Sequence, residues 1–505
     1  MNEKEFKMIK DFPFFLWATL VYALFYVVCL YKNGSGITFP FFTVGTVTYF
    51  ILCMKKLEAK MKPYSIFYMS CILLLGLSTC LTDSWIIIFF NKITIFFLIV
   101  LFLLHSFYED KNWKFTGFLK AYFITVFVPI AYVYKPFSHL IHYRKMRKEM
   151  GIENKNKNKN ALYVFVGILI SIPLLCVILS LLISSDMIFE NMFKRMYFEI
   201  LFSSLIVDGF FTSILFVVVF LCAYMLVSFL SNYRMDNMEK EEKKGEPILA
   251  ITISSILSVV YIIFCSIQVI YLFLGRSTGL SLPDGMIYSE YAREGFFQLL
   301  FVCIINLVLV LLGIYLFRES KVLKTFLCII TSCTFIMIVS SALRMILYIQ
   351  HQYLTFLRVF VLWALLVILL VMIGVMIAIF KKDFPLFRYS TTLFIILYLL
   401  LSFGKVDYFV AKVNVDNMRL ETQYEFFKGT ELYDDEDYLM RNLSLDAAKV
   451  IIDYKEEEVK GETSYYNQRR EDYISYILYE TNDMEIRNLN VSRYIAREKA
   501  ELNSK

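Results

Sequence analysis

Three cations lie inside long apolar segments of the sequence, where an ionisable side chain is costly and is a functional hypothesis by default. They are Lys92, Arg344 and Arg358. Each arginine is seven positions from His351, and Lys92 is eight positions from Ser84. At about 1.5 Å per helical residue, all three would lie roughly 10 Å inside the same face of a membrane. The spacing therefore predicts a layer of positive charge near one membrane surface.

The segment Tyr288–Gln298 supplies possible partners for these cations, because it carries Glu290, Arg293 and Glu294 just before a long apolar run. One hypothesis is structural: the acids pair with the buried arginines and lock the helices together. A second is a basic pocket that receives an anionic ligand such as a lipid head group. A third is a charged lining of a transport path. The cluster is therefore predicted to be a structural brace, a ligand site or part of a transport path, and the structural hypothesis is preferred.

Catalytic motifs are not evident elsewhere in the sequence. The last hundred residues contain no histidine, and no Ser/His/Asp set, HExxH or paired-carboxylate motif stands out. The ten cysteines all fall in apolar segments without metal-ligand spacing, so they are interpreted as small buried hydrophobic residues. No catalytic residue, metal or cofactor is predicted, and the protein is expected not to be an enzyme.

The elements that must position these charges are transmembrane helices. The composition is 58% hydrophobic with only 19% charged residues, against about 25% charged in soluble proteins. Apolar runs long enough to cross a bilayer are typically about 20 residues. The sequence contains eleven candidates, at Phe14–Leu30, Ile37–Met54, Tyr64–Leu81, Trp85–His105, Leu162–Ser184, Gly209–Leu230, Ile248–Leu274, Phe297–Phe317, Phe326–Gln350, Leu354–Phe380 and Thr391–Phe403. A further apolar segment, Phe118–Tyr134, is predicted to be interfacial or re-entrant because it contains Lys120 and Pro129.

The charge of the loops predicts the orientation. With a cytoplasmic amino terminus, the cytoplasmic segments carry 28 Lys and Arg residues and the opposite loops carry 5. Cytoplasmic loops of membrane proteins hold such an excess. The same tendency accounts for the net charge of +6 without a nucleic-acid partner. Eleven spans would then leave the chain after about Phe403 on the extracytoplasmic side.

The tail differs from the rest of the chain in composition. Residues 404–505 carry 22 acidic and 15 basic residues and no long apolar run. Helical periodicity is visible in Tyr408–Phe427, Ser444–Tyr454, Asp472–Tyr479 and Val491–Leu502. The predicted organisation is therefore all-α: a transmembrane bundle over residues 1–403 and a small helical extracytoplasmic domain over residues 404–505.

Several motifs also resemble a known family. The run Tyr291–Leu299, followed by Asn306, is similar to the central signature of bacterial multi-pass proteins grouped as domain of unknown function 4153/4173. The arginine-hairpin-arginine pattern of Arg344 and Arg358 is similar to a second signature. The segments Asp83–Asn91, Asn414–Asn417 and Asn490–Arg493 resemble other parts of the same family. The resemblance implies a multi-pass membrane protein and no defined activity.

Three functional hypotheses follow. The preferred one is a nonenzymatic sensor, scaffold or assembly factor in a bacterial plasma membrane, with the lipid bilayer as its surroundings and an envelope protein as a possible partner of the tail. A transporter or binder of an anionic solute or lipid head group is the alternative. A membrane enzyme acting on an envelope lipid or polymer is the second alternative.

Overall fold

The computed structural model is helical throughout the part of the chain that it describes, with one isolated β-bridge, between Gly245 and Phe317. It describes residues 3–150, 204–235, 245–270, 288–351, 353–423, 438–455 and 465–504, together with a few isolated positions between 167 and 238. The side chains of 204–207, 288–295, 350–351 and 419–423 are outside this description. The all-α prediction is confirmed.

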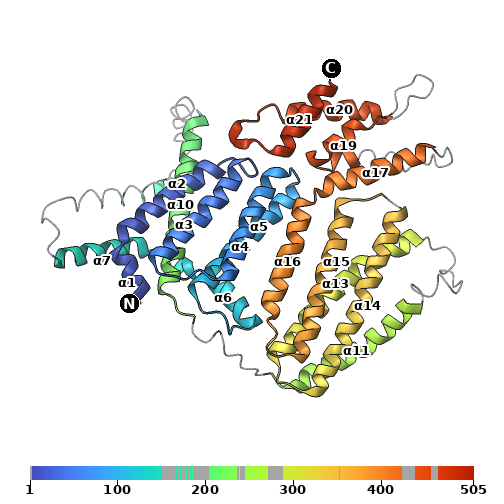
Figure 1. Ribbon diagram of the computed structural model, residues 1–505, viewed down its shortest axis with the longest axis horizontal. Coiled ribbons are helices and arrows are strands. Elements are labelled where there is room, and N and C mark those ends of the chain that lie inside the picture. The colour runs from blue at the N-terminus through green and yellow to red at the C-terminus, as the bar shows by residue number, and fades with distance from the viewer. Residues whose placement is uncertain are drawn as a thin grey trace.

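The first half of the bundle is built from helices that run back and forth beside their neighbours in sequence (Figure 1). α4 and α7 each have a proline in their first turn, where the missing N–H costs no helical hydrogen bond. The helices are α1 (Glu3–Lys10), α2 (Phe12–Leu30), α3 (Thr38–Lys56), α4 (Pro63–Leu81), α5 (Trp85–Phe107), α6 (Phe115–Phe127), α7 (Lys135–Glu149) and α10 (Ser204–Asn232), with the short 3-10 helix η1 (Val128–Tyr132) after α6.

The second half consists of five long helices, of which α13 and α14 form the most extensive pair. The Thr355 side chain caps the start of α15 by accepting a hydrogen bond from the backbone of Arg358, which satisfies one of the N–H groups left open there. The helices are α11 (Pro247–Gln268), α13 (Tyr288–Leu316), α14 (Lys321–His351), α15 (Phe356–Phe380) and α16 (Leu386–Phe403).

Eleven helices within the described residues are long and apolar enough to cross a membrane. Ten of them coincide with predicted spans. The remaining predicted span, Leu162–Ser184, lies outside the described residues apart from isolated positions. The eleventh helix is Phe115–Tyr132, formed by α6 and η1. The segment predicted to be interfacial or re-entrant is therefore a helical stretch of spanning length, with Pro129 in its closing 3-10 turn.

The C-terminal domain begins where the chain bends after α16. Lys405 has a φ of 43°, in the left-handed region that side chains adopt only occasionally, and α17 starts immediately after it. The tail helices coincide with those expected from periodicity. They are α17 (Val406–Gln423), α19 (Ala448–Asp453), α20 (Tyr465–Glu480) and α21 (Val491–Asn503), with the 3-10 turns η3 (Leu445–Ala447) and η4 (Ile486–Asn488).

This domain covers one end of the bundle, and the amino terminus lies at the opposite end (Figure 1). Its apolar core is continuous with that of the first half: Val410 and Ile451 of the domain belong to the same buried cluster as Phe50 and Leu98 of the spans. The second half of the bundle has two separate clusters of its own. The tail is thus packed onto the bundle as part of its core.

Candidate functional site at the junction of the bundle and the C-terminal domain

The hairpin tip between α2 and α3 is fastened to the C-terminal domain by backbone contacts. The Asn33 side chain donates to the Arg487 carbonyl at 2.8 Å, and the Ile37 amide donates to the Leu489 carbonyl at 2.8 Å. Gly36 lies between them, where a Cβ would collide with the backbone of Arg487. A glycine is needed here because two backbones approach closely.

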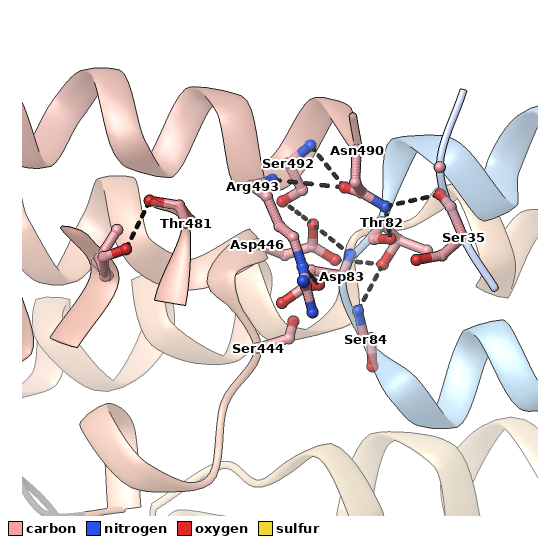
Figure 2. A network of polar contacts seen from close by, with 12 residues as sticks. Ser35, Thr82, Asp83, Ser84, Ser444, Asp446, Thr481, Asn490, Ser492 and Arg493 are labelled. Atoms are coloured by element: carbon pink, nitrogen blue, oxygen red, sulfur yellow. Dashed lines mark hydrogen bonds and ion pairs between the residues drawn. The ribbon is translucent and has the colours of Figure 1, made fainter. Parts of the chain in front are cut away.

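Asn490 connects two turns of the bundle, one between α2 and α3 and one between α4 and α5, to the start of α21 (Figure 2). Its side-chain nitrogen donates to the carbonyls of Ser35, at 3.2 Å, and Thr82, at 2.8 Å. Its side-chain oxygen accepts from the Ser492 amide at 3.0 Å, which caps the helix. This residue is fully buried. One amide therefore satisfies polar groups from three segments distant in sequence.

Asp446 is the second centre of this network, and its side chain is 6% exposed. The hydroxyls of Thr82 and Ser492 donate to its carboxylate, and the amide of Asp83 adds a longer contact at 3.4 Å. Figure 2 shows the carboxylate between α21 and the turn that joins α4 to α5. A buried carboxylate with several donors holds the two elements in register.

The remaining contacts join the domain to the second half of the bundle. The Asn414 side chain forms a paired hydrogen bond with the backbone of Leu354, accepting at 2.9 Å and donating at 2.8 Å. The Tyr438 hydroxyl accepts from the Phe356 amide at 3.1 Å. The domain therefore contacts the end of α14 and the start of α15 as well as the first four spans.

A cleft of about 600 Å³ lies between these docking contacts. The bundle contributes the turn before α5 and the start of α15, and the domain contributes α17, the segment before η3, α20 and α21. This volume falls within the usual range for a small-molecule site. The walls combine aromatic rings with charges of both signs: Trp85, Phe356, Tyr473 and Tyr476; Arg441, Arg469 and Arg493; Asp83, Asp407 and Asp472.

Two carboxyls of the cleft have altered proton affinity. Burial raises the pKa of Asp83, and the nearby Arg493 guanidinium, whose Nε lies 2.6 Å from the carboxylate, only partly opposes that effect. Burial also raises the pKa of Asp407, although the Ser444 hydroxyl and amide donate to it at 2.5 and 3.3 Å. Removing a carboxylate from water disfavours its charged form. Both groups hold protons more tightly than ordinary aspartates.

Tyr473 brings an unused polar atom to the cleft. The residue is 4% exposed, and its hydroxyl has no hydrogen-bond partner among the described residues. Leaving a buried hydroxyl unsatisfied costs about 1–3 kcal/mol, so native proteins rarely keep one without a reason. The hydroxyl also lies near enough to Asp83 and Asp407 for their charges to raise its pKa, after the larger effect of burial.

The two arginines singled out in the sequence, Arg344 and Arg358, do not line the cleft. Arg344 is 4% exposed and donates from Nη2 to the side-chain oxygen of Gln268 at 3.0 Å, which also accepts from Ser340 at 2.7 Å. These contacts join α14 to α11 inside the bundle. Arg358 lies over the Tyr348 ring at 4.2 Å, a cation–π geometry, and donates to the Tyr353 carbonyl. It therefore stabilises the turn between α14 and α15.

Lys92 lies in the first half of the bundle, away from these contacts. Its Nζ is 5.9 Å from the centre of the Phe39 ring and is next to Gly34 in the tip between α2 and α3. The side chains of Glu290, Arg293 and Glu294 lie outside the described residues, although their backbone belongs to α13. Their pairing with the arginines stays a prediction.

Sequence reasoning identified part of the junction and missed its centre. Asp83, Asn414 and the Asn490–Arg493 segment were recognised as family-like motifs. Asp446 was included only in the predicted helical segment Ser444–Tyr454, and neither Asp407 nor Tyr473 was singled out. The available signal was two polar residues, Ser444 and Asp446, in a segment that the structure buries. Within the described residues, no group of three or more His, Cys, Asp or Glu side chains could hold a metal ion.

Comparison with known proteins supports the resemblance carried by these motifs. A family model described as "Domain of unknown function (DUF4153)" matches residues 69–454, which include Asp83, Asn414 and Asp446. No curated protein and no solved structure matches the chain. The match extends over more than half of the sequence and over both the spans and part of the tail. The chain belongs to the DUF4153 family.

Proposed function

We propose that this protein is a nonenzymatic membrane receptor, acting as a sensor or scaffold, that binds a polar ligand in the cleft between its spans and its C-terminal domain. One observation carries the proposal: both the bundle and the domain supply walls of the same cleft. A ligand in contact with both parts would stabilise one arrangement of the domain on the spans. Differential contact of this kind is what allows a ligand to shift a conformational equilibrium.

The charges of the cleft indicate the class of ligand. Three arginines face three aspartates, so a simple anion would meet carboxylates as well as guanidinium groups. Trp85 and Tyr476 are 74% and 53% exposed and offer ring faces for stacking. A ligand with both acidic and basic or hydroxyl groups, such as a short peptide or an amino-sugar fragment of an envelope polymer, fits this balance.

The test is Tyr473→Phe. The change removes the unpartnered hydroxyl, so for a cleft without a ligand the thermal stability of the purified protein should stay equal or rise. If the protein is a receptor, the variant without ligand should be as stable as the wild type. Its apparent affinity for peptide or amino-sugar fragments, measured from the rise in melting temperature that they cause, should fall by about tenfold. The matched control is Tyr466→Phe. The Tyr466 hydroxyl donates to the Ile451 carbonyl at 2.9 Å, and this residue does not line the cleft. Equal ligand stabilisation in the two variants would contradict the proposal.

We also propose that the domain is extracytoplasmic, as the loop charges predict. A cysteine replacing Tyr479, which is 82% exposed, should react with a membrane-impermeant thiol reagent in intact cells. A cysteine replacing the exposed Lys145 of α7 should react only after lysis. The reverse pattern would overturn this topology.

The raised pKa values of Asp83 and Asp407 favour a second candidate function. Buried carboxyls with high proton affinity in a cleft are typical of acid–base catalysis, and the Tyr473 hydroxyl lies near both. The same fragments would then be hydrolysed rather than only bound. Incubation of the purified protein with them, with Asp407→Asn as the comparison, separates the two functions by the appearance of products.

A further inference from the structure

A second cavity lies at the end of the bundle opposite the C-terminal domain. It has a volume of about 390 Å³ and is enclosed by the loop between α5 and α6, the end of α13, and the loop between α15 and α16. It is thus placed where the two halves of the bundle meet. None of the contacts of the cleft involves these segments.

The charge of this cavity is one-sided. Its lining contains four cations, Lys111, Lys114, Lys382 and Arg388, and one carboxylate, Asp383. A smaller adjoining cavity shares Lys114 and Lys382 and adds Arg318 and Lys324, with Glu319 as its acid. Glu319 already pairs with Lys382 at 2.9 Å and with Lys324 at 3.5 Å. The cations converge on a concave surface and exceed the acids that face it.

Arg388 is held at the inner wall of the cavity by the protein itself. Its Nη2 donates to the Asp110 carbonyl at 3.1 Å and lies 3.4 Å from the Asp110 carboxylate. Its side chain is 21% exposed, so one guanidinium is positioned and partly desolvated while the lysines stand at the rim. Fixed guanidinium groups with flexible lysines nearby are suited to phosphate oxygens.

The floor of the cavity is apolar and lies at the ends of spans. Phe118 and Phe387 stack at 4.4 Å between ring centres, and Phe115 stacks on Tyr315 at 5.5 Å. The apolar helical stretches Phe115–Tyr132 and Leu386–Phe403 both begin here. The cations therefore stand at the depth of lipid head groups, above a wall that an acyl chain can follow. A free phosphate would make no use of that wall.

From this arrangement we infer that the cavity binds the phosphate head group of an anionic phospholipid. A general excess of positive charge on this side would attract such lipids without selecting a position. The α7 helix illustrates that case, because Lys145 and Lys148 are exposed along a helix surface. The cavity differs by combining converging cations, a fixed arginine and an apolar floor.

The experiment uses the full-length protein purified in detergent and measures retained lipid by native mass spectrometry, with phosphatidylglycerol against phosphatidylcholine. The test variant is Lys111→Gln, Lys114→Gln, Lys382→Gln. The control is Lys60→Gln, Lys145→Gln, Lys148→Gln, which removes the same charge from exposed positions of the same side. The wild type should prefer phosphatidylglycerol, and the test variant should bind it at least about tenfold more weakly, while the control changes less than about twofold.

Two results would overturn the inference. Equal loss in both variants would show a diffuse attraction to basic loops. Competition by soluble glycerol phosphate at the same concentration as the lipid would show a site for a free phosphate ester. Since all six positions are exposed, the melting temperature of each variant should match the wild type, and the comparison does not depend on folding.

Discussion

The two ends of the bundle use charged residues in different ways. The docking face, formed by the loops at residues 31–37, 82–84, 353–355 and 404–405, binds the C-terminal domain through buried polar groups such as Asn490 and Asp446. The basic face, formed by the loops at residues 55–62, 108–114, 317–320 and 381–385, carries an excess of lysine and arginine on an open surface. Polar residues hold two parts together at the first face, whereas most of the lysines at the second are exposed.

The carboxyls of the two faces reflect this difference. At the docking face, burial dominates and raises the pKa of Asp83 and Asp407. At the basic face, burial also acts to raise the pKa of Asp110, but the hydrogen bond from His105 and the charges of Arg388 and Lys62 bring it below the usual range. The balance between burial and nearby hydrogen bonds and cations therefore sets the direction of each pKa shift. Burial outweighs the other effects for Asp83 and Asp407, and pairing outweighs burial for Asp110.

Asp446→Ala should have the largest effect on the docking face. The change leaves the hydroxyls of Thr82 and Ser492 without their shared acceptor in a buried position. The expected loss is about 3 kcal/mol of the free energy of unfolding, because two buried hydrogen bonds are lost and two buried donors are left unsatisfied. Thermal unfolding of the purified protein and protease sensitivity of the tail measure it.

The control for that change is Asp453→Ala. Asp453 is 43% exposed and pairs with Lys499 at 2.7 Å on the surface of the same domain. Exposed pairs contribute about 0–1 kcal/mol, so its loss should be small. If the two variants were equally stable, the buried network would not be what fastens the domain.

Asp110→Asn tests the basic face. The amide keeps the shape but removes the charge that Arg388 and Lys62 approach at 3.4 and 3.6 Å. We expect a loss of about 2 kcal/mol, since a buried residue loses charge-assisted contacts without loss of volume. Calorimetry of the purified variant measures the loss. A loss above that of Asp446→Ala would reverse the ranking of the two faces.

The sequence predicted the spans and the tail helices well, because hydrophobic run length and helical periodicity are local properties. Ten predicted spans and the four expected tail segments correspond to helices of the structure. The cleft could not be predicted in the same way. Asp83 and Arg493 are 410 positions apart, and only the docking of the domain brings them together. Arg344 was identified from its position inside an apolar run, but its partner Gln268 is a neutral residue that a search for opposite charges passes over.

Arg344→Ala tests the contact between α14 and α11, which the C-terminal domain does not touch through these residues. Polar contacts between membrane helices contribute on average less than about 1 kcal/mol, so the expected loss is about 1 kcal/mol, below the effects of Asp446 and Asp110. If Arg344 is a brace, Gln268→Ala has a similar effect, and the double variant loses little more than either single change. Stability of the four proteins in lipid nanodiscs measures the coupling. Full additivity would mean that the pair is not a brace.

The smallest predicted effect concerns pH. A carboxyl whose pKa is raised on folding stabilises the folded state when protonated, and this contribution is lost as pH rises through its folded value. Asp83 and Asp407 should therefore make the docking face more stable as the pH falls from 7 toward about 4. Asp110, with a lowered pKa, contributes stability above the ordinary aspartate value of about 3.9 that is lost only at lower pH.

The two faces can then be separated by substitution, because Asp407→Asn mimics the protonated form at every pH. The melting temperature of this variant should rise less than that of the wild type between pH 7 and about 4. The free energies of unfolding of the two proteins should diverge by less than about 1.4 kcal/mol per pH unit. Asp453→Asn should follow the wild type. Asp110→Asn should follow it too over this interval and differ in slope only at lower pH. An acid-induced gain that survives in Asp407→Asn but disappears in Asp110→Asn would mean that the basic face, rather than the docking face, responds to mild acid.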